Sequence, residues 1–203
     1  RGVVLVEMLM YLENKSVQQI IGEIKSESDS VKSIECKFLI PSVAPGTFRT
    51  EISLGNSLLS DMACYPLSLL TIAGYDLSNL SLIADKSKIK GDVVFCIKGK
   101  AKKTNIHIWL GQTDQYLNTL TVQFDDQREI NCEPFFYGRS GYRKLNRVTR
   151  AGTRLERVLE TNSYELMFLR RRSEWITTQK DRLDALELVS ESLERLGRQA
   201  GLH

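Results

Sequence analysis

The sequence predicts an α+β fold in which helices cover one face of an open, mostly antiparallel sheet. Residues 90–130 alternate apolar and polar side chains over three segments, the period-two pattern of half-buried strands. Turn-like links such as "GQTD" and "DDQ" separate these segments, and links this short favour an antiparallel meander. Apolar residues with helical spacing occur near both ends of the chain. Helices outside one central sheet are typical of the α+β class.

A helix and a strand are predicted ahead of the meander. Apolar residues of "SVQQIIGEI", residues 16–24, recur at helical intervals, and Asn14 or Ser16 is placed to cap the first turn. In "SIECKFLI", residues 33–40, apolar and polar side chains alternate. This alternation indicates a strand with one buried face.

Two helices are predicted at the C-terminal end of the chain. The first carries Tyr164, Met167 and Phe168 on one side. The second follows a capping box that runs from Thr178 to Asp181. Its apolar side comprises Leu183, Leu186, Val189, Leu193 and Leu196.

Length and composition describe a globular chain of one large or two small domains, and a single α+β domain over residues 1–203 is expected. A hydrophobic content of 42% is enough for a sizeable core, and a net charge of +3 is too small to indicate a nucleic-acid partner. No apolar stretch approaches the ~20 residues of a membrane span, and no secretory cleavage signal is present, so a cytoplasmic protein is expected. The cysteines are scattered and lack the spacing of a zinc site, so no metal is expected.

The stretch "GNSLLSDMACYPLSLL", residues 55–70, places an acid and a phenol on one helical face. Asp61 and Tyr65 are four residues apart, so they face the same way and can reach each other or one shared ligand. Two interpretations are open at this point. Asp61 can complement the helix dipole while Tyr65 tethers a neighbouring element, or the pair can belong to a binding or catalytic site.

The residues around this pair carry a family resemblance. In "FRTEISLGNSLLSDMACYPL", Phe48 and Arg49 form an aromatic-Arg pair, Gly55 follows, and a helix with Asp61 and Tyr65 comes next. This pattern resembles the signature of the glucose-fructose oxidoreductase, inositol dehydrogenase and MocA (Gfo/Idh/MocA) family. The order of the predicted elements is similar to that family over nearly the whole chain.

The resemblance implies a two-domain parent protein. Members of the family have a nucleotide-binding Rossmann half and an α+β half with most substrate contacts and the oligomer interface, and this chain resembles only the second. Residues 1–11 are then expected to be the crossover strand from a missing Rossmann domain. NAD or NADP and a sugar or nucleotide-sugar substrate are implied for the parent. The sequence has no G-x-G-x-x-G, so no cofactor is expected to bind this chain itself.

The resemblance also implies roles for individual residues. Tyr65 would be the acid/base that moves the proton of a sugar hydroxyl, and Asp61 would orient that hydroxyl or Tyr65 itself. Arg49, Lys15 and Tyr11 would bind substrate. For Arg49 a loop ion pair, and for Lys15 a solvated side chain, stays open as the alternative.

A non-catalytic dimerisation or assembly module with the same fold is the alternative function. Trp109 is expected to point away from the side that Ile106 and Ile108 occupy, which places it on the second face of the sheet. That face is then expected to form the interface of a homo-oligomer. Asn56 and Ser57 replace two glycines of the family signature, which favours this alternative.

A basic run between residues 138 and 157 allows three interpretations. It can be a solvated loop, a grip on the phosphates of a nucleotide sugar, or a nucleic-acid patch that lacks an aromatic platform. The run contains Arg139, Arg143, Lys144, Arg147, Arg150, Arg154 and Arg157.

Overall fold

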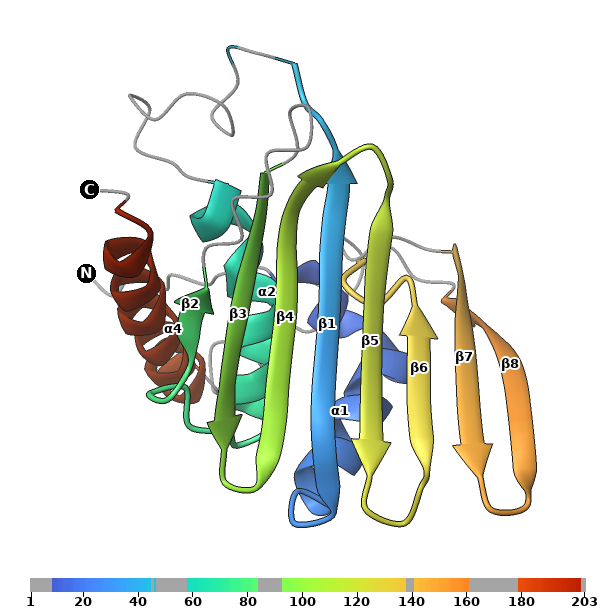
Figure 1. The fold of residues 1–203 in the computed structure, drawn as a ribbon. Helices are drawn as coiled ribbons and strands as arrows, with labels where there is room; N and C mark the ends of the chain where they lie inside the picture. Colours follow the sequence, from blue (N-terminus) through green and yellow to red (C-terminus); the bar gives the residue numbers. More distant parts are fainter. Residues whose placement is uncertain are drawn as a thin grey trace.

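A computed structural model describes residues 9–44, 46, 58–83, 93–137, 141–160 and 179–201 (Figure 1). Eight strands form one open sheet in the order β2-β3-β4-β1-β5-β6-β7-β8. Helices α1 and α2 cover one face of the sheet, and α4 packs on α2 near the β2 edge. Among the described strands, β1 and β4 are parallel and the other neighbouring pairs are antiparallel. The predicted α+β class, with an open and mostly antiparallel sheet, is confirmed.

The helices and strands that the sequence predicted within the described residues occur in the predicted order along the chain. The helical elements are η1 (Met10–Glu13), α1 (Lys15–Ser26), α2 (Leu58–Ile72) and α4 (Gln179–Ala200). The strands are β1 (Val31–Pro41), β2 (Ser81–Ile83), β3 (Val93–Ala101), β4 (Thr104–Thr113), β5 (Leu117–Phe124), β6 (Glu129–Glu133), β7 (Gly141–Thr149) and β8 (Gly152–Glu160).

Strand β1 interrupts the predicted meander. β4 and β5 are joined by residues 114–116 alone, yet β1 lies between them, parallel to β4 and antiparallel to β5. The short link passes over the end of β1 at the top of Figure 1. The prediction of an uninterrupted meander was wrong because alternation fixes which face of a strand is buried and does not fix its neighbours.

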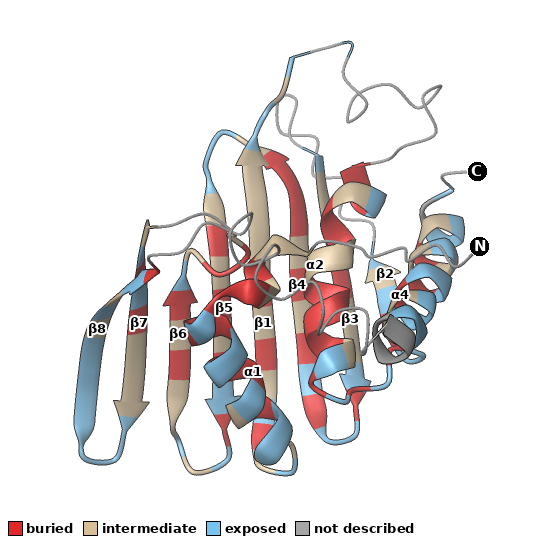
Figure 2. Ribbon diagram, turned by 180° about the vertical axis from the view of Figure 1, so that it is seen from behind, coloured by how far each residue is buried: buried red, intermediate tan, exposed pale blue. Residues whose placement is uncertain are grey.

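The core lies between the sheet and its helices, as Figure 2 shows from the helical side. Ile106, Ile108 and Leu110 of β4 are fully buried, and so are Val17 and Ile20 of α1. Burying an aliphatic side chain of this size contributes about 1.5–3 kcal/mol. The apolar side chains that recur every second residue in the strands therefore pack against those that recur every 3.6 residues in α1, on one face of the sheet.

The N-terminal segment is helical where it can be described. The strand predicted over residues 1–11 does not continue to its end, because Met10–Glu13 form a 3-10 turn in which the Leu12 amide donates to the Leu9 carbonyl at 3.0 Å. Tyr11 is 0% exposed within this turn. Residues 1–8 of the predicted strand lie outside the described residues.

Neither predicted cap serves helix α1. Asn14 Nδ2 donates instead to the Tyr137 carbonyl at 2.6 Å, and Ser16 Oγ donates to Glu160 Oε1. The same Glu160 oxygen accepts the Ser16 amide at 3.2 Å. An acid from β8 thus satisfies an amide of the first turn and meets the positive end of the helix dipole. The local prediction was wrong because a partner distant in sequence replaces the local cap.

The basic run forms a hairpin. Residues 141–160 make β7 and β8, so the interpretation as a loop is wrong. Arg143 is 2% exposed and Leu145 is 4% exposed, both on the helix-covered face. Arginine carries a long aliphatic stem, and alternating arginines therefore concealed a half-buried strand pattern.

The C-terminal helix α4 confirms the second of the two predicted helices. Val189 and Leu196 are buried, whereas Leu183 is 39% exposed and does not belong to the buried stripe. The first predicted helix, with Tyr164, Met167 and Phe168, lies outside the described residues, as does the cap at Thr178.

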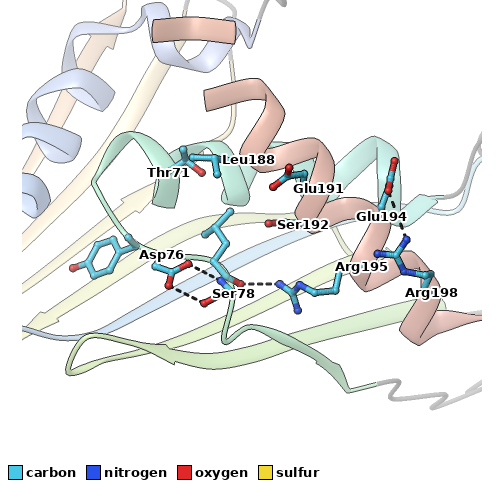
Figure 3. Close-up of a pocket in the computed structure, with 11 residues that line it drawn as sticks. Thr71, Asp76, Ser78, Leu188, Glu191, Ser192, Glu194, Arg195 and Arg198 are labelled. Atoms are coloured by element: carbon cyan, nitrogen blue, oxygen red, sulfur yellow. Dashed lines mark hydrogen bonds and ion pairs between the residues drawn. The ribbon is translucent and has the colours of Figure 1, made fainter. Parts of the chain in front are cut away.

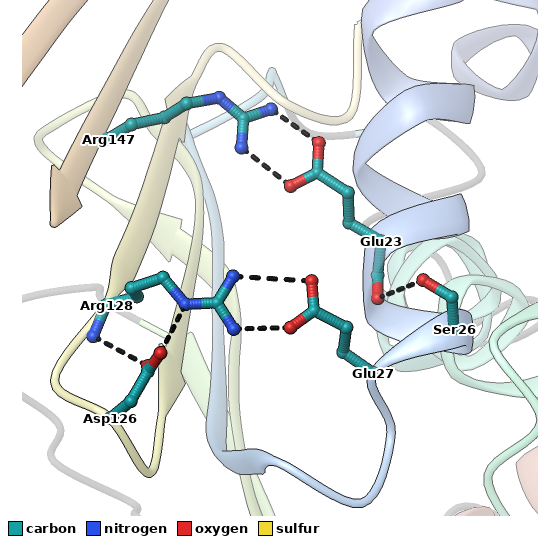
Figure 4. Close-up of polar contacts among 6 residues, drawn as sticks. All are labelled: Glu23, Ser26, Glu27, Asp126, Arg128 and Arg147. Atoms are coloured by element: carbon teal, nitrogen blue, oxygen red, sulfur yellow. Dashed lines mark hydrogen bonds and ion pairs between the residues drawn. The ribbon is translucent and has the colours of Figure 1, made fainter.

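Two arginines of the sheet connect it to acids of α1 (Figure 4). Arg147 of β7 donates to both carboxylate oxygens of Glu23, at 2.6 and 2.7 Å. Arg128, in the β5–β6 turn, donates to both oxygens of Glu27, and its Nε donates to Asp126 at 2.7 Å. Bidentate pairs of this kind fix geometry as well as charge, so they set how α1 lies on the sheet.

The stability that Arg128 gives should be lost in acid. Hydrogen bonds from Arg128 lower the pKa of Glu27 and the pKa of Asp126 from their ordinary values. A carboxyl with a lowered folded-state pKa stabilises the protein above its unfolded pKa of about 4, and this contribution disappears as the pH falls through the folded-state pKa. The urea midpoint should therefore fall less on acidification in Arg128→Gln than in the wild type.

Lys103→Gln provides the matched control for this titration. Lys103 pairs with Asp125 at 2.8 Å, and both side chains are 52% exposed. Exposed pairs contribute about 0–1 kcal/mol, so the pH dependence should stay close to wild type. Equal dependence in the wild type and in Arg128→Gln would contradict the prediction.

Candidate functional site

Helix α2 carries both candidate catalytic residues. Leu58, Leu59, Met62 and the residues that follow at helical spacing are buried against the sheet, which explains the helix. Asp61 lies in the first turn and Tyr65 one turn later, and both are partly buried. The predicted placement of an acid and a phenol on one helical face is therefore confirmed.

Aromatic rings hold the Tyr65 side chain. The Tyr65 ring lies 5.3 Å from Phe38 of β1 in an edge-to-face arrangement, 5.8 Å from Tyr11 and 6.3 Å from Phe136. Phe38 and Phe136 also contact each other at 5.7 Å. Offset and edge-to-face pairs are the preferred geometries of aromatic rings, so the cluster restricts the orientation of the phenol.

Tyr11 of η1 is hydrogen-bonded to helix α2. Its hydroxyl lies 3.0 Å from the Tyr65 carbonyl oxygen, to which it donates, and 2.9 Å from Ser68 Oγ. Burial raises the pKa of the Tyr11 phenol well above its ordinary value, and the hydrogen bond with Ser68 opposes this in part. A fully buried hydroxyl committed to α2 is a support for Tyr65. This position does not suit the direct substrate contact that the resemblance implied for Tyr11.

Asn118 of β5 holds the segment that carries Phe136. Its Oδ1 accepts the amides of Phe135 and Phe136 at 3.1 and 2.7 Å, and its Nδ2 donates to the Phe136 carbonyl at 3.1 Å. Asn118 is 1% exposed. One buried carboxamide therefore satisfies the backbone of two residues that could not reach water.

Arg143 of β7 holds the same segment from the other side. Its guanidinium donates to the carbonyl oxygens of Pro134, Phe135 and Tyr137, the Phe135 contact being 2.8 Å. Arg143 Nε lies 3.8 Å from Glu160 Oε1. Burial lowers the pKa of Arg143 from its ordinary value, and Cys132 and Glu160 oppose this shift. We call residues 134–137, with their carbonyls held by Arg143, Asn118 and Asn14, the clamped loop.

The clamped loop could not be found from the sequence as part of the site. Asn118 interrupts the apolar side of a strand, which is a weak signal, and Arg143 belongs to a run that reads as solvated. Lys15 is exposed in the first turn of α1. Arg49, together with Phe48 and Gly55, lies outside the described residues. The structure thus brings together Asp61, Tyr65 and Tyr11 of the predicted set.

A pocket of about 420 Å³ lies at the other end of α2, against α4 (Figure 3). Part of its polar lining is engaged in the fold: Asp76 accepts the Ser78 amide and hydroxyl at 2.9 and 2.7 Å, and Arg195 donates to the Leu77 and Leu80 carbonyls. Asp61 and Tyr65 lie ten and six residues before Thr71, the pocket residue of α2, which is about 15 and 9 Å along the helix axis. The pocket is therefore distinct from the Tyr65 site.

The described ranges contain neither a candidate metal site nor a candidate membrane-spanning helix. Histidine, cysteine and acidic side chains there do not gather in groups of three that could hold a metal ion. Of the helices in those ranges, none combines the length and apolar character needed to cross a membrane.

Solved sugar oxidoreductases share this fold. The aldose-aldose oxidoreductase of Caulobacter crescentus, solved with glycerol, matches 98% of this chain with a TM-score of 0.74 and 15% identity. UDP-N-acetylglucosamine 3-dehydrogenase GnnA of Acidithiobacillus ferrooxidans matches 99% with a TM-score of 0.68 and 14% identity. KijD10, a 3-ketoreductase of Actinomadura kijaniata solved with NADP and TDP-benzene, matches 95% with a TM-score of 0.69 and 14% identity.

The match covers only part of each of these proteins. The chain spans 63%, 63% and 61% of their respective lengths. No protein-family model matches the sequence, and no curated protein matches it. At this identity the likeness establishes the fold alone, and this is the fold that the sequence resemblance implied.

Proposed function

We propose that this chain is the substrate-binding and oligomerisation half of an NAD(P)-dependent oxidoreductase that acts on a sugar or nucleotide sugar. The observation that supports this most directly is the Asp61–Tyr65 pair on α2, with the Tyr65 ring enclosed by Phe38 and Phe136. The fold shared with sugar oxidoreductases supports the same assignment. The nicotinamide cofactor and the domain that binds it belong to the parent protein in this proposal, and the isolated chain is inactive.

In the proposed reaction the chain positions the substrate and moves one proton. Tyr65 exchanges a proton with the reacting hydroxyl through its phenol oxygen, while Asp61 accepts a hydrogen bond that orients that hydroxyl or the phenol. A phenol with an ordinary pKa of about 10 needs a positive field to act near neutrality. The parent protein would supply that field from outside the described residues. When bound, the nicotinamide supplies or accepts the hydride.

A second candidate function, assembly through the outer face of the sheet, rests on a separate observation. The outer face is the one away from α1 and α2. Cross-strand register places Ile83, Cys96 and Trp109 in one row on this face, and Ile83 is 50% exposed. Tyr142 and Leu159, paired across β7 and β8, are 58% and 50% exposed. Exposed apolar side chains thus lie at the β2 end and at the β7–β8 end of this face, and we propose that a second copy of the chain covers them.

Trp109→Glu should weaken self-association through this face. The Trp109 ring lies 5.8 Å from the His107 ring of β4, and Lys37 Nζ of β1 lies 5.4 Å from its centre, so Trp109 contacts polar neighbours of two strands on the outer face. An introduced carboxylate would lose its hydration in a paired state, and its nearby cation, Lys37, already pairs with Glu35 at 2.7 Å. Light scattering at micromolar concentration should report a dimer or larger for the wild type and a smaller species for the variant.

Gln19→Glu is the control for added charge, because Gln19 is exposed on α1, on the opposite face of the sheet. It should leave the oligomeric state unchanged. A wild-type mass of 23.1 kDa at high concentration would overturn both the self-association and the assembly function.

A further inference from the structure

Gln112, near the end of β4, has a buried side-chain nitrogen, Nε2, without a hydrogen-bond partner among the described residues. The residue is 8% exposed, and Nε2 has no hydrogen-bond acceptor among the residues that the structure describes. More than nine in ten buried polar groups in folded proteins are hydrogen-bonded, because an unpaired one costs stability. An unpaired buried donor close to a candidate site therefore points to an acceptor outside the described residues, and a bound ligand is such an acceptor.

Gln112 faces the same side of the sheet as the aromatic cluster. Strand β4 buries Ile108 and Leu110 on the helix-covered face, and Gln112 continues this alternation. Register across β1 pairs Leu110 with Phe38, which places Gln112 one strand and two residues away from Phe38. Strand spacing and rise make this distance about 8 Å between backbones.

The aromatic cluster links Gln112 to the candidate catalytic residues. The Phe38 ring is 5.3 Å from the Tyr65 ring. Both views of the fold place the first turn of α2, which carries Asp61, at the end of the sheet where β4 ends. The unpaired amide, the carboxylate and the phenol thus lie at one end of the helix-covered face.

Gly111 allows the backbone conformation of β4 immediately before Gln112. Its φ is +151°, and a Cβ at this position would lie 1.9 Å from the Val93 carbonyl oxygen of β3. β4 curves at this point, as its upper end in Figure 1 shows. Glycine is therefore required here, and the bend in β4 is built into the sequence immediately before the unpaired amide.

We propose that Gln112 is a substrate-binding residue of the Tyr65 site, and that its amide donates a hydrogen bond to a neutral hydroxyl or carbonyl oxygen of a bound sugar. This rests on the proposed function, of which it names one contact. A carboxamide is uncharged, and phosphate groups are met mainly by arginine, lysine and backbone amides. Gln112 therefore selects for the sugar ring and not for the phosphates of a nucleotide sugar.

Gln112→Met tests this inference through two readouts that move in opposite directions. Methionine keeps the unbranched shape and removes the unpaired donor, so the urea midpoint of the chain should rise. In the two-domain parent protein, KM for the sugar should rise about 3- to 10-fold while kcat changes little, the effect of one lost neutral hydrogen bond. A residue that only supports the fold would not raise stability and KM together.

Asn146→Val is the matched control. Asn146 Oδ1 is also buried without a hydrogen-bond partner among the described residues, but it lies on β7, in the hairpin of the basic run. This variant should raise the urea midpoint in the same way and leave KM unchanged. An equal KM change in the two variants would show a general effect of stability and overturn the assignment.

Sugar binding by Gln112 can be tested without turnover, so the test does not depend on whether the proposed reaction occurs. The side-chain amide signal of Gln112 should shift on titration of the chain with D-glucose and stay in place with inorganic phosphate. Tyr65→Phe should retain this shift, because the phenol oxygen is not part of the contact. No shift with glucose, a shift with phosphate alone, or a destabilised Gln112→Met would overturn the inference. Loss of turnover in the parent with the glucose shift intact would count against the oxidoreductase proposal alone.

Discussion

Tyr65→Phe should lower kcat of the two-domain parent protein by about 10²- to 10⁴-fold, the range for a lost general acid or base. The ring contacts with Phe38 and Phe136 do not involve the hydroxyl, so the variant should keep the aromatic cluster. KM should change little, because the missing group acts on the proton that moves and not on the remainder of the substrate. Steady-state kinetics and a urea titration of the same preparation would measure both effects.

Tyr11→Phe is the control for this variant. The Tyr11 hydroxyl contacts the Tyr65 carbonyl and Ser68 but is 0% exposed, so it cannot exchange a proton with a substrate. Its loss should reduce stability by about 0.5–1.5 kcal/mol, the value of one hydrogen bond, with a much smaller effect on kcat. Wild-type turnover in Tyr65→Phe would assign Tyr65 to the packing of α2 alone.

Local patterns predicted the elements that depend on local spacing. The apolar spacing of residues 16–24 predicted α1, and the alternation of residues 33–40 predicted β1. The partners of these elements were harder to predict. β1 pairs with β4 and β5, which follow it by more than sixty residues, and alternation contains no information on strand order.

In the candidate site too, local spacing could be predicted from the sequence and long-range contacts could not. Asp61 and Tyr65 are one helical turn apart, so their common face followed from the sequence. The residues that hold Tyr65 come from β1, η1 and the clamped loop, with Tyr11 and Phe136 separated by 125 positions of chain numbering. Such contacts require the fold to be known. A buried arginine among solvated ones also has no sequence signal, because burial depends on the hairpin to which it belongs.

Arg143→Met should cost about 3–5 kcal/mol of folding free energy, the range for removing one partner of a buried charged pair. Arg143 is 2% exposed and donates to three carbonyls of the clamped loop. Methionine fills part of the volume but leaves those carbonyls without their donor and leaves Glu160 without its nearby cation. The free energy of unfolding from urea titration would measure the loss.

Arg147→Met, on the same strand, separates burial from charge. Arg147 makes a bidentate pair with Glu23, but the two side chains are 26% and 33% exposed. Loss of a pair in contact with water costs about 0–1 kcal/mol. A similar cost in both variants would contradict the prediction and show that the clamped loop is held by its other contacts.

Arg143→Lys separates charge from geometry. Lysine keeps the positive charge near Glu160, but a single ammonium cannot reproduce the planar fork that reaches three carbonyls. We therefore expect a loss between those of Arg147→Met and Arg143→Met. Because Phe136 of the clamped loop contacts both Tyr11 and Tyr65, release of the loop should also change the near-ultraviolet circular dichroism of the tyrosines. A stability loss with an unchanged tyrosine signal would mean that Arg143 holds the hairpin but does not position Tyr65.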